Sequence, residues 1–252
     1  MKHIELTIAF VLLALVLNVS AYGQKNHTGK TNKKGFAVLE LFTSEGCSSC
    51  PTADELMGKI QNEYKDQPVY VLSYHVDYWD DLGWKDIFSN ADYTKRQYSY
   101  GKWLQKEPIY TPQLIINGKT DYVGSQETAV RSGFTKLLSK PAEANLVISA
   151  QRLKNGSLVS YKASGNSRNT QLVLVLVQKS AKNKVKRGEN EGKLLSHYQI
   201  VRNLTTRSIT ADEKGRTNLY FPKNFNTQNA EIVGFIQDTA TGNILGATKV
   251  NL

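Results

Sequence analysis

The chain has 252 residues, of which 40% are hydrophobic and 21% are charged. This globular composition excludes an intrinsically disordered protein and leaves room for one large domain or two of ordinary size. The formal net charge is +10, and the excess lies in residues 151–216, which hold 14 Lys and Arg against 4 Asp and Glu. Such a stretch is compatible with contact to an anionic surface or an acidic partner, and the alternative is a solvated basic face that keeps the protein soluble. We expect no nucleic acid ligand because no aromatic-interleaved binding motif accompanies it.

The amino-terminal segment predicts export. Residues 8–19 (IAFVLLALVLNV) are apolar except for Asn18, and the small residues Ala21 and Gly23 follow as a cleavage signal. The run is short for a bilayer span, so we interpret residues 1–23 as a signal peptide, with a retained membrane anchor as the alternative. The mature protein is then periplasmic or secreted, and its basic stretch would face an anionic envelope surface.

A polar leader over residues 24–35 precedes the first ordered element. Residues 36–43 predict a strand, a helix is expected from the Cys47-Ser48-Ser49-Cys50 motif to about residue 64, and residues 69–76 predict a second buried strand. Two strands joined through a helix of this length are expected to pair in parallel.

The next segment, residues 77–105, is rich in Tyr and Trp and predicts a helical insert. Strands are expected over 110–116 and 120–124, joined by a hairpin turn at Asn117-Gly118, and a helix over 126–139. The order of elements is that of the thioredoxin superfamily. We therefore predict an α/β thioredoxin-like domain with a helical insert over residues 36–140.

The second half of the chain has a different character. Short alternating or apolar runs separated by turn residues predict a small all-β, antiparallel sandwich-like domain over residues 141–252. The runs are 146–150, 158–163, 172–178, 197–201, 216–221 and 232–237.

The two cysteines are the candidate catalytic residues. A Cys-x-x-Cys bridge closes so short a loop that it restricts the unfolded chain little, which favours a redox role over a stabilising one. At a helix start the first sulfur gains from the helix dipole, so we expect a solvent-reachable Cys47 as nucleophile and Cys50 as resolving thiol, with no cofactor. Neighbouring acidic residues, Glu45 and Asp54 among them, predict only a moderately lowered pKa for Cys47.

Two further pairs are candidate substrate-binding residues. Thr111 and Pro112 stand where thioredoxin-like folds place a cis proline opposite the dithiol, so we expect a cis bond there. His75 and Asp77 follow the second strand at the end where parallel sheets build their sites. Their role is substrate contact or proton handling, or, for the histidine, a hydrogen-bonded core position.

Several motifs resemble an exported bacterial family of uncharacterised thioredoxin-like proteins. They are LELFTSEGCSSCPTAD at 39–54, SYHVDYWDDLGWKDIFS at 73–89, TPQLIINGK at 111–119 and RGENEGKLLSHYQIVR at 187–202. The resemblance covers nearly all the mature chain and implies fold and export but no substrate. Glu45 stands where relatives often carry Gln.

Three functions remain open. The first is an extracytoplasmic thiol-disulfide oxidoreductase or thiol-dependent chaperone, acting on protein thiols or disulfides with an unidentified redox partner. The second is copper handling, with Cys47, Cys50 and His75 as ligands. The third is an envelope binding module whose disulfide stays closed and whose 181–207 region, with the loop 187–190, makes the contact.

Overall fold

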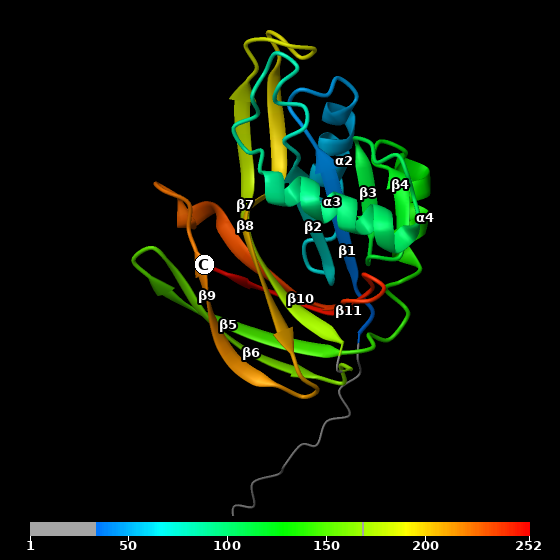
Figure 1. Cartoon of the computed structure of the whole chain (residues 1–252), viewed down its shortest axis with the longest axis vertical. Helices are drawn as coiled ribbons and strands as arrows, with labels where there is room; N and C mark the ends of the chain where they lie inside the picture. The colour runs from blue at the N-terminus through cyan, green and yellow to red at the C-terminus, as the bar shows by residue number, and fades with distance from the viewer. Residues whose placement is uncertain (1–33, 168) are drawn as a thin grey trace, which may run out of the picture. The chain divides into compact units, whose positions relative to one another are not determined.

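The computed structural model describes residues 34–167 and 169–252, which belong to one compact unit (Figure 1). The expected signal peptide, residues 1–23, and most of the leader lie outside the described residues. Within the described part, none of the helices has the length and apolar character needed to cross a membrane.

The expected β-α-β unit around the cysteines is present. Strand β1 (Ala37–Thr43) is fully buried and pairs in parallel with β2 (Val69–His75). Helix α2 (Cys50–Glu63) connects them, with a proline in its first turn, where the missing N–H costs nothing. Its apolar face packs against β1 and β2 in one hydrophobic cluster, so the helix start is fixed beside the end of β1.

The remaining elements of the first half are shorter. The predicted hairpin joins β3 (Gln113–Ile116) to β4 (Thr120–Val123), and both turn residues, Asn117 and Gly118, have positive φ, as a two-residue turn of this kind requires. The segment predicted as a helical insert contains one α-helix, α3 (Ala91–Leu104), and α4 (Glu127–Thr135) follows β4.

The second half consists of strands and one short 3-10 helix, η2 (Thr227–Asn229). Strand β11 was not predicted, because its alternating side chains are only partly apolar. The strands are β5 (Asn145–Leu153), β6 (Gly156–Ser164), β7 (Thr170–Lys184), β8 (Leu194–Ile209), β9 (Lys214–Tyr220), β10 (Ala230–Asp238) and β11 (Ile244–Asn251).

The predicted fold class, a thioredoxin-like domain with a helical insert followed by a separate all-β domain, is wrong. One mixed eight-stranded sheet runs through both halves in the order β11-β10-β7-β8-β2-β1-β3-β4. The halves join where β8 pairs in parallel with β2, at Ser73 and Ile200. The described residues contain three α-helices, and most of the structure is this sheet (Figure 1).

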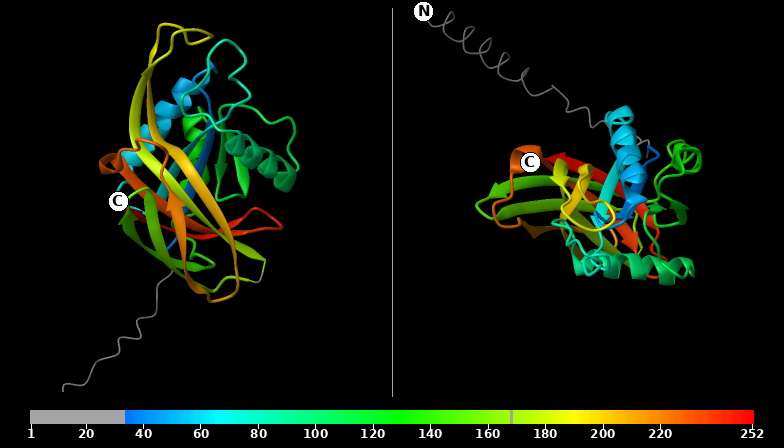
Figure 2. Two further views of the ribbon diagram at one scale, coloured as in Figure 1. Left: turned by 60° about the vertical axis from the view of Figure 1, so that its left-hand side comes forward. Right: turned by 90° about the horizontal axis from the view of Figure 1, so that it is seen from above.

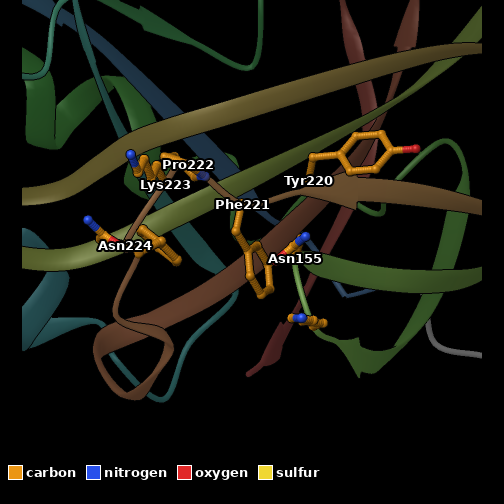
Figure 3. A pocket seen from close by; sticks show the side chains of 8 residues that line it. Asn155, Tyr220, Phe221, Pro222, Lys223 and Asn224 are labelled. Atoms are coloured by element: carbon orange, nitrogen blue, oxygen red, sulfur yellow. The ribbon is translucent and has the colours of Figure 1, made fainter.

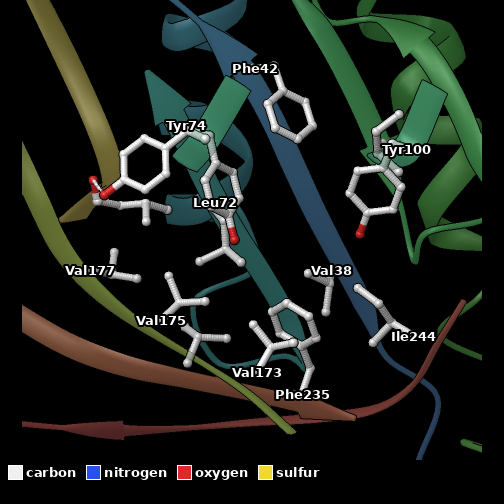
Figure 4. Packing of buried hydrophobic residues seen from close by; sticks show 14 of the residues in the cluster. Val38, Phe42, Leu72, Tyr74, Tyr100, Val173, Val175, Val177, Phe235 and Ile244 are labelled. Carbon is white, nitrogen blue, oxygen red and sulfur yellow. Dashed lines mark hydrogen bonds between the residues drawn. The ribbon is translucent and has the colours of Figure 1, made fainter. Parts of the chain in front are cut away.

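The two halves do not form separate domains because β7 is buried on both faces. Its valines, Val173, Val175 and Val177, enter the core that also contains residues of β1 and β2 (Figure 4). Its leucines enter a second core, against the three-stranded sheet β5-β6-β9. A strand apolar on both faces belongs inside a layered structure, so β7 cannot be one outer wall of an independent sandwich. Figure 2 shows the smaller sheet stacked on the β7–β10 part of the larger one.

The hairpin formed by β7 and β8 extends beyond the sheet. Its register shifts between Leu176 and Val177, and Gln199 has a positive φ of 51°, so the far part of the hairpin leaves the plane of the sheet. It lies over α2, where a Cβ added at Gly58 would come within 2.7 Å of the Tyr198 ring. The hairpin end is thereby brought to the start of α2 (Figure 1).

Candidate functional site at the cysteine pair

Cys47 and Cys50 form a disulfide with a Cα–Cα distance of 5.5 Å. Cys47 lies in the turn before α2, where its N–H donates to the Ser44 carbonyl at 3.2 Å and its own carbonyl accepts from the Cys50 N–H at 3.3 Å. Cys50 is the first residue of the helix. The pair therefore stands at the helix start, as predicted from the motif.

The expectation of a solvent-reachable first sulfur is wrong for this structure. Cys47 is 1% exposed and Cys50 is 0% exposed. The two residues between them, Ser48 and Ser49, are exposed, and the Ser49 hydroxyl lies 3.4 Å from the Cys47 sulfur. The disulfide is thus covered, and the exposed serines mark the side on which it approaches the surface.

The cysteine turn is bound by the loop between β7 and β8, residues 185–193, which we call the hairpin tip. Asn190 is fully buried, and its amide donates to the carbonyls of Glu45 and Cys47, each at 2.9 Å. The Glu189 carboxylate accepts from the Ser48 N–H at 2.9 Å. The loop that the sequence suggested for partner recognition therefore binds the cysteine segment of its own chain.

A buried polar network continues beneath this contact, centred on Glu45. Its carboxylate accepts from the Trp84 indole N–H at 2.7 Å and from the Asn183 amide at 2.9 Å. The His197 ring lies between two carboxylates, with Nε2 at 3.1 Å from Glu45 and Nδ1 at 3.3 Å from Asp54. Glu45 is thus fixed by partners from other segments and directed toward a histidine.

The two carboxylates give His197 an unusual pKa. Burial lowers the pKa of the imidazole, but hydrogen bonds and charge interactions with Asp54 and Glu45 outweigh it and raise the pKa to about 9. His197 therefore carries a positive charge at neutral pH. The segment around the cysteines lacks a basic residue in the sequence, and the fold supplies one from β8.

His75 belongs to the same buried cluster. Its Nδ1 lies 2.6 Å from Asp86, and its ring meets that of His197 at a centroid distance of 4.9 Å. Burial raises the pKa of Asp86, but the charge and hydrogen bond of His75 and two backbone N–H groups lower it overall. One of those groups is the Glu45 N–H, at 2.8 Å. His75 is thereby linked to the residue two positions before Cys47.

The Thr111–Pro112 peptide bond is cis, as predicted. Trp79 connects this bond to the cysteine turn, since its indole N–H donates to the Thr111 hydroxyl at 2.9 Å and a Cβ added at Gly46 would lie 3.1 Å from the Trp79 Cβ. Asp77, by contrast, points toward α3: its carboxylate accepts from the Thr94 hydroxyl.

No group of three or more His, Cys, Asp and Glu side chains is arranged to hold a metal ion among the residues that the structure describes. The ligand set suggested for copper, Cys47, Cys50 and His75, therefore receives no support from the geometry. The His75 ring faces Asp86 and His197, and the two sulfurs are bonded to one another.

A separate hollow of about 520 Å³ lies at the far end of the small sheet (Figure 3). Its lining combines aromatic rings with lysine and asparagine side chains and contains no acidic residue. The residues are Lys154, Asn155, Tyr220, Phe221, Pro222, Lys223, Asn224 and Phe225. The Phe221 and Phe225 rings meet at a centroid distance of 5.6 Å. Lys154 and Lys223 thus place part of the basic second half around a concave surface.

Sequence reasoning missed most residues that surround the disulfide. Asn183, Glu189 and Asn190 lie more than 130 positions from Cys47, and the sequence placed them in a region expected to bind a partner rather than the cysteine turn. One signal was available for His197, because it stands in a predicted strand run, where a buried histidine needs hydrogen-bond partners that only the fold can supply.

A family model described as a protein of unknown function (DUF1223) matches residues 38–237. No curated protein matches the chain. Among solved structures, the X-ray crystal structure of protein AGR_C_4864 from Agrobacterium tumefaciens is similar, with 26% identity and a TM-score of 0.65 over 85% of this chain and 93% of that chain.

Two further solved structures are much less similar. A domain of the outer membrane lipoprotein Omp28 from Porphyromonas gingivalis covers 44% of this chain and 88% of that chain, with 15% identity and a TM-score of 0.29. A β-glucuronidase from Ruminococcus gnavus covers 44% and 16%, with 14% identity and a TM-score of 0.23. Similarity at this level carries no argument about function.

Proposed function

We propose that this chain, which belongs to the DUF1223 family of proteins of unknown function, is an exported thiol-disulfide oxidoreductase or thiol-dependent chaperone that acts through Cys47 and Cys50. The observation that carries the proposal is the disulfide itself, which closes across the first turn of α2 beside two exposed serines. Export is proposed from the apolar run at residues 8–19 and its small-residue cleavage signal.

The position of the pair supports exchange chemistry over a stabilising role. A bridge between residues three positions apart removes little entropy from the unfolded chain. The start of α2 has no side-chain cap, so its backbone N–H groups and the positive end of the helix dipole favour a thiolate on Cys47 after reduction. His197 partly neutralises Glu45 and Asp54, which reduces the opposition of these two carboxylates to a thiolate.

We expect exchange to proceed through two successive thiolate attacks. An external thiolate attacks the Cys47 sulfur, forming a mixed disulfide while the Cys47–Cys50 bond breaks and Cys50 leaves as a thiolate. A second external thiolate attacks the mixed disulfide at the external sulfur, releasing an oxidised substrate and the Cys47 thiolate. Two substrate thiols lose two electrons and the protein disulfide gains them. The reverse sequence reduces a substrate disulfide.

Replacing Cys47 by serine is expected to abolish exchange. The reduced wild-type protein should accelerate the reduction of insulin disulfides, measured as turbidity in dithiothreitol, and Cys47→Ser should fall to the uncatalysed rate because no mixed disulfide forms. Ser48→Ala is the matched control, since it alters an exposed neighbour without removing sulfur. A wild-type protein inactive in both reduction and oxidation assays would contradict the proposal.

A second candidate function, binding to an anionic envelope surface, is favoured by the basic hollow at Lys154 and Lys223, whose lining has no acidic residue. We expect the double change Lys154→Glu and Lys223→Glu to weaken sedimentation with vesicles containing anionic lipid severalfold at low salt. The control is Lys59→Glu and Lys65→Glu, in the groove beside α2. Equal binding of both double variants would exclude the hollow as the contact.

A further inference from the structure

We propose that the hairpin tip, residues 185–193, determines which thiols react with the disulfide, and that it favours extended polypeptides over small thiols. This inference rests on the proposed exchange function. Asn190 and Glu189 are its positioning residues. They act on Cys47 through the hydrogen bonds that close the tip over the cysteine turn, and they take no part in the transfer of electrons.

The tip is closed over the cysteine turn at three points. The Asn190 amide donates to the carbonyls of Glu45 and Cys47, and the Glu189 carboxylate accepts from the Ser48 N–H. These bonds hold all of the backbone from Glu45 to Ser48 against the tip. An attacking thiolate must approach the Cys47 sulfur along the S–S bond, and in this closed arrangement Cys47 is 1% exposed.

The tip is also built to move as one piece. Its two ends are tied together by the Val185 N–H donating to the Lys193 carbonyl at 3.0 Å and the Gly192 N–H donating to the Val185 carbonyl at 2.9 Å. The Lys193 ammonium holds the Asn190 side-chain oxygen at 2.9 Å, which fixes the amide toward the cysteine turn. Opening therefore breaks the hydrogen bonds to the cysteine turn and separates Gly188 from Trp84, beside which it lies, while the hydrogen bonds within the tip can persist.

The chemistry of these contacts indicates the substrate class. The turn offers the tip two acceptors, the carbonyls of Glu45 and Cys47, and one donor, the Ser48 N–H. Backbone groups of this kind are the ones that an extended polypeptide pairs with through its own backbone. A polypeptide that displaces the tip replaces the bonds lost from Asn190 and Glu189. A small thiol has too few groups to do so, and it reacts only when the tip opens unaided.

The test compares two thiols acting on the oxidised full-length protein: reduced glutathione and a reduced, extended peptide containing one cysteine. Free Cys47 and Cys50 are counted by alkylation and mass spectrometry over time. Asn190→Ala should react about tenfold faster with glutathione, because two hydrogen bonds that close the tip are lost. Its rate with the peptide should change much less, so the preference for the peptide should fall.

Glu191→Gln is the matched control, since Glu191 is an exposed carboxylate of the same tip with no contact to the cysteine turn. Its rates should equal those of the wild type. Should Asn190→Ala fail to fold by circular dichroism, Glu189→Ala removes the exposed contact to Ser48 and should shift both rates in the same direction. Faster amide hydrogen exchange at Ser48 in Asn190→Ala, which keeps the Glu189 acceptor, gives an independent measure of opening.

Failure of the proposed exchange function and failure of the inference about the tip give different results. If the wild type and every variant form no mixed disulfide with either thiol, the proposed exchange function is wrong. If exchange occurs but Asn190→Ala and Glu189→Ala react with glutathione at the wild-type rate, the tip does not control access, and the inference is wrong while the proposed function stands.

Discussion

Replacing His197 by glutamine should flatten the pH dependence of stability between pH 6.5 and 9. The folded-state pKa of His197 is raised to about 9, above the unfolded value near 6.5, so its contribution is fully present below pH 6.5 and is lost as pH rises through 9. A shift of this size corresponds to about 3 kcal/mol. The wild-type advantage over His197→Gln should therefore shrink by about that amount across this interval.

Urea unfolding of the oxidised protein at several pH values between 6 and 10 measures this difference directly. The disulfide does not titrate, so the cysteines do not contribute while it stays closed. Ser196→Ala is the matched control, because it alters the neighbouring residue of β8 without removing a titrating group. A constant difference between wild type and His197→Gln over the whole interval would show that no charged histidine lies between Glu45 and Asp54.

The first half of the fold was predictable because its signals are local. The β-α-β unit follows from two apolar strands and a proline in the first helical turn, and the Asn117-Gly118 turn has the two positive φ angles that its residue types permit. The position of the cysteine pair at the start of α2 needed only the motif and these elements.

The continuity of the sheet was not predictable in the same way. Residues 172–177 are predicted to form an apolar strand whatever the fold is. Their pattern does not predict that the valines face one core and the leucines another. A parallel pairing between β2 and β8 joins residues 127 positions apart, at Ser73 and Ile200. Such a contact leaves no mark in local periodicity.

For the same reason, the cysteine pair was predictable from the sequence but the side chains packed around it were not. From the local sequence, the charge of Glu45 was predicted to oppose a thiolate on Cys47. In the structure its carboxylate is held by Trp84, Asn183 and His197, so its charge is balanced by a group 152 positions away. The electrostatics of a turn depend on whatever the fold packs against it.

A second buried ion pair lies within the first half of the chain and is hydrogen-bonded to the second half. Arg96 of α3 donates to Glu40 of β1 at 2.7 Å, to the Tyr100 hydroxyl at 3.0 Å and to the Gln237 side-chain oxygen of β10 at 3.3 Å. Glu40 is fully buried and Arg96 is 8% exposed. Two charges at such depth are tolerated only while each has its partner.

Arg96→Met should therefore lower the free energy of unfolding by about 3–5 kcal/mol, because it leaves the Glu40 carboxylate buried without its cation. The double variant Glu40→Met, Arg96→Met should lose less than the single one, since it removes both charges and keeps apolar volume. Urea unfolding at pH 7 measures both. A double variant less stable than Arg96→Met would mean that the pair stabilises the fold beyond mutual neutralisation.

The same experiment tests whether the two halves unfold together. All three tryptophans lie in residues 79–103, so fluorescence reports the first half, whereas pulsed amide hydrogen exchange of peptides from residues 145–251 reports the strands of the second half. Because the ion pair, β7 and the β2–β8 contact tie both halves into one sheet, the two signals should give coincident transitions, shifted equally by Arg96→Met. A fluorescence transition that moves to lower urea alone would show that the halves unfold independently, despite the shared sheet.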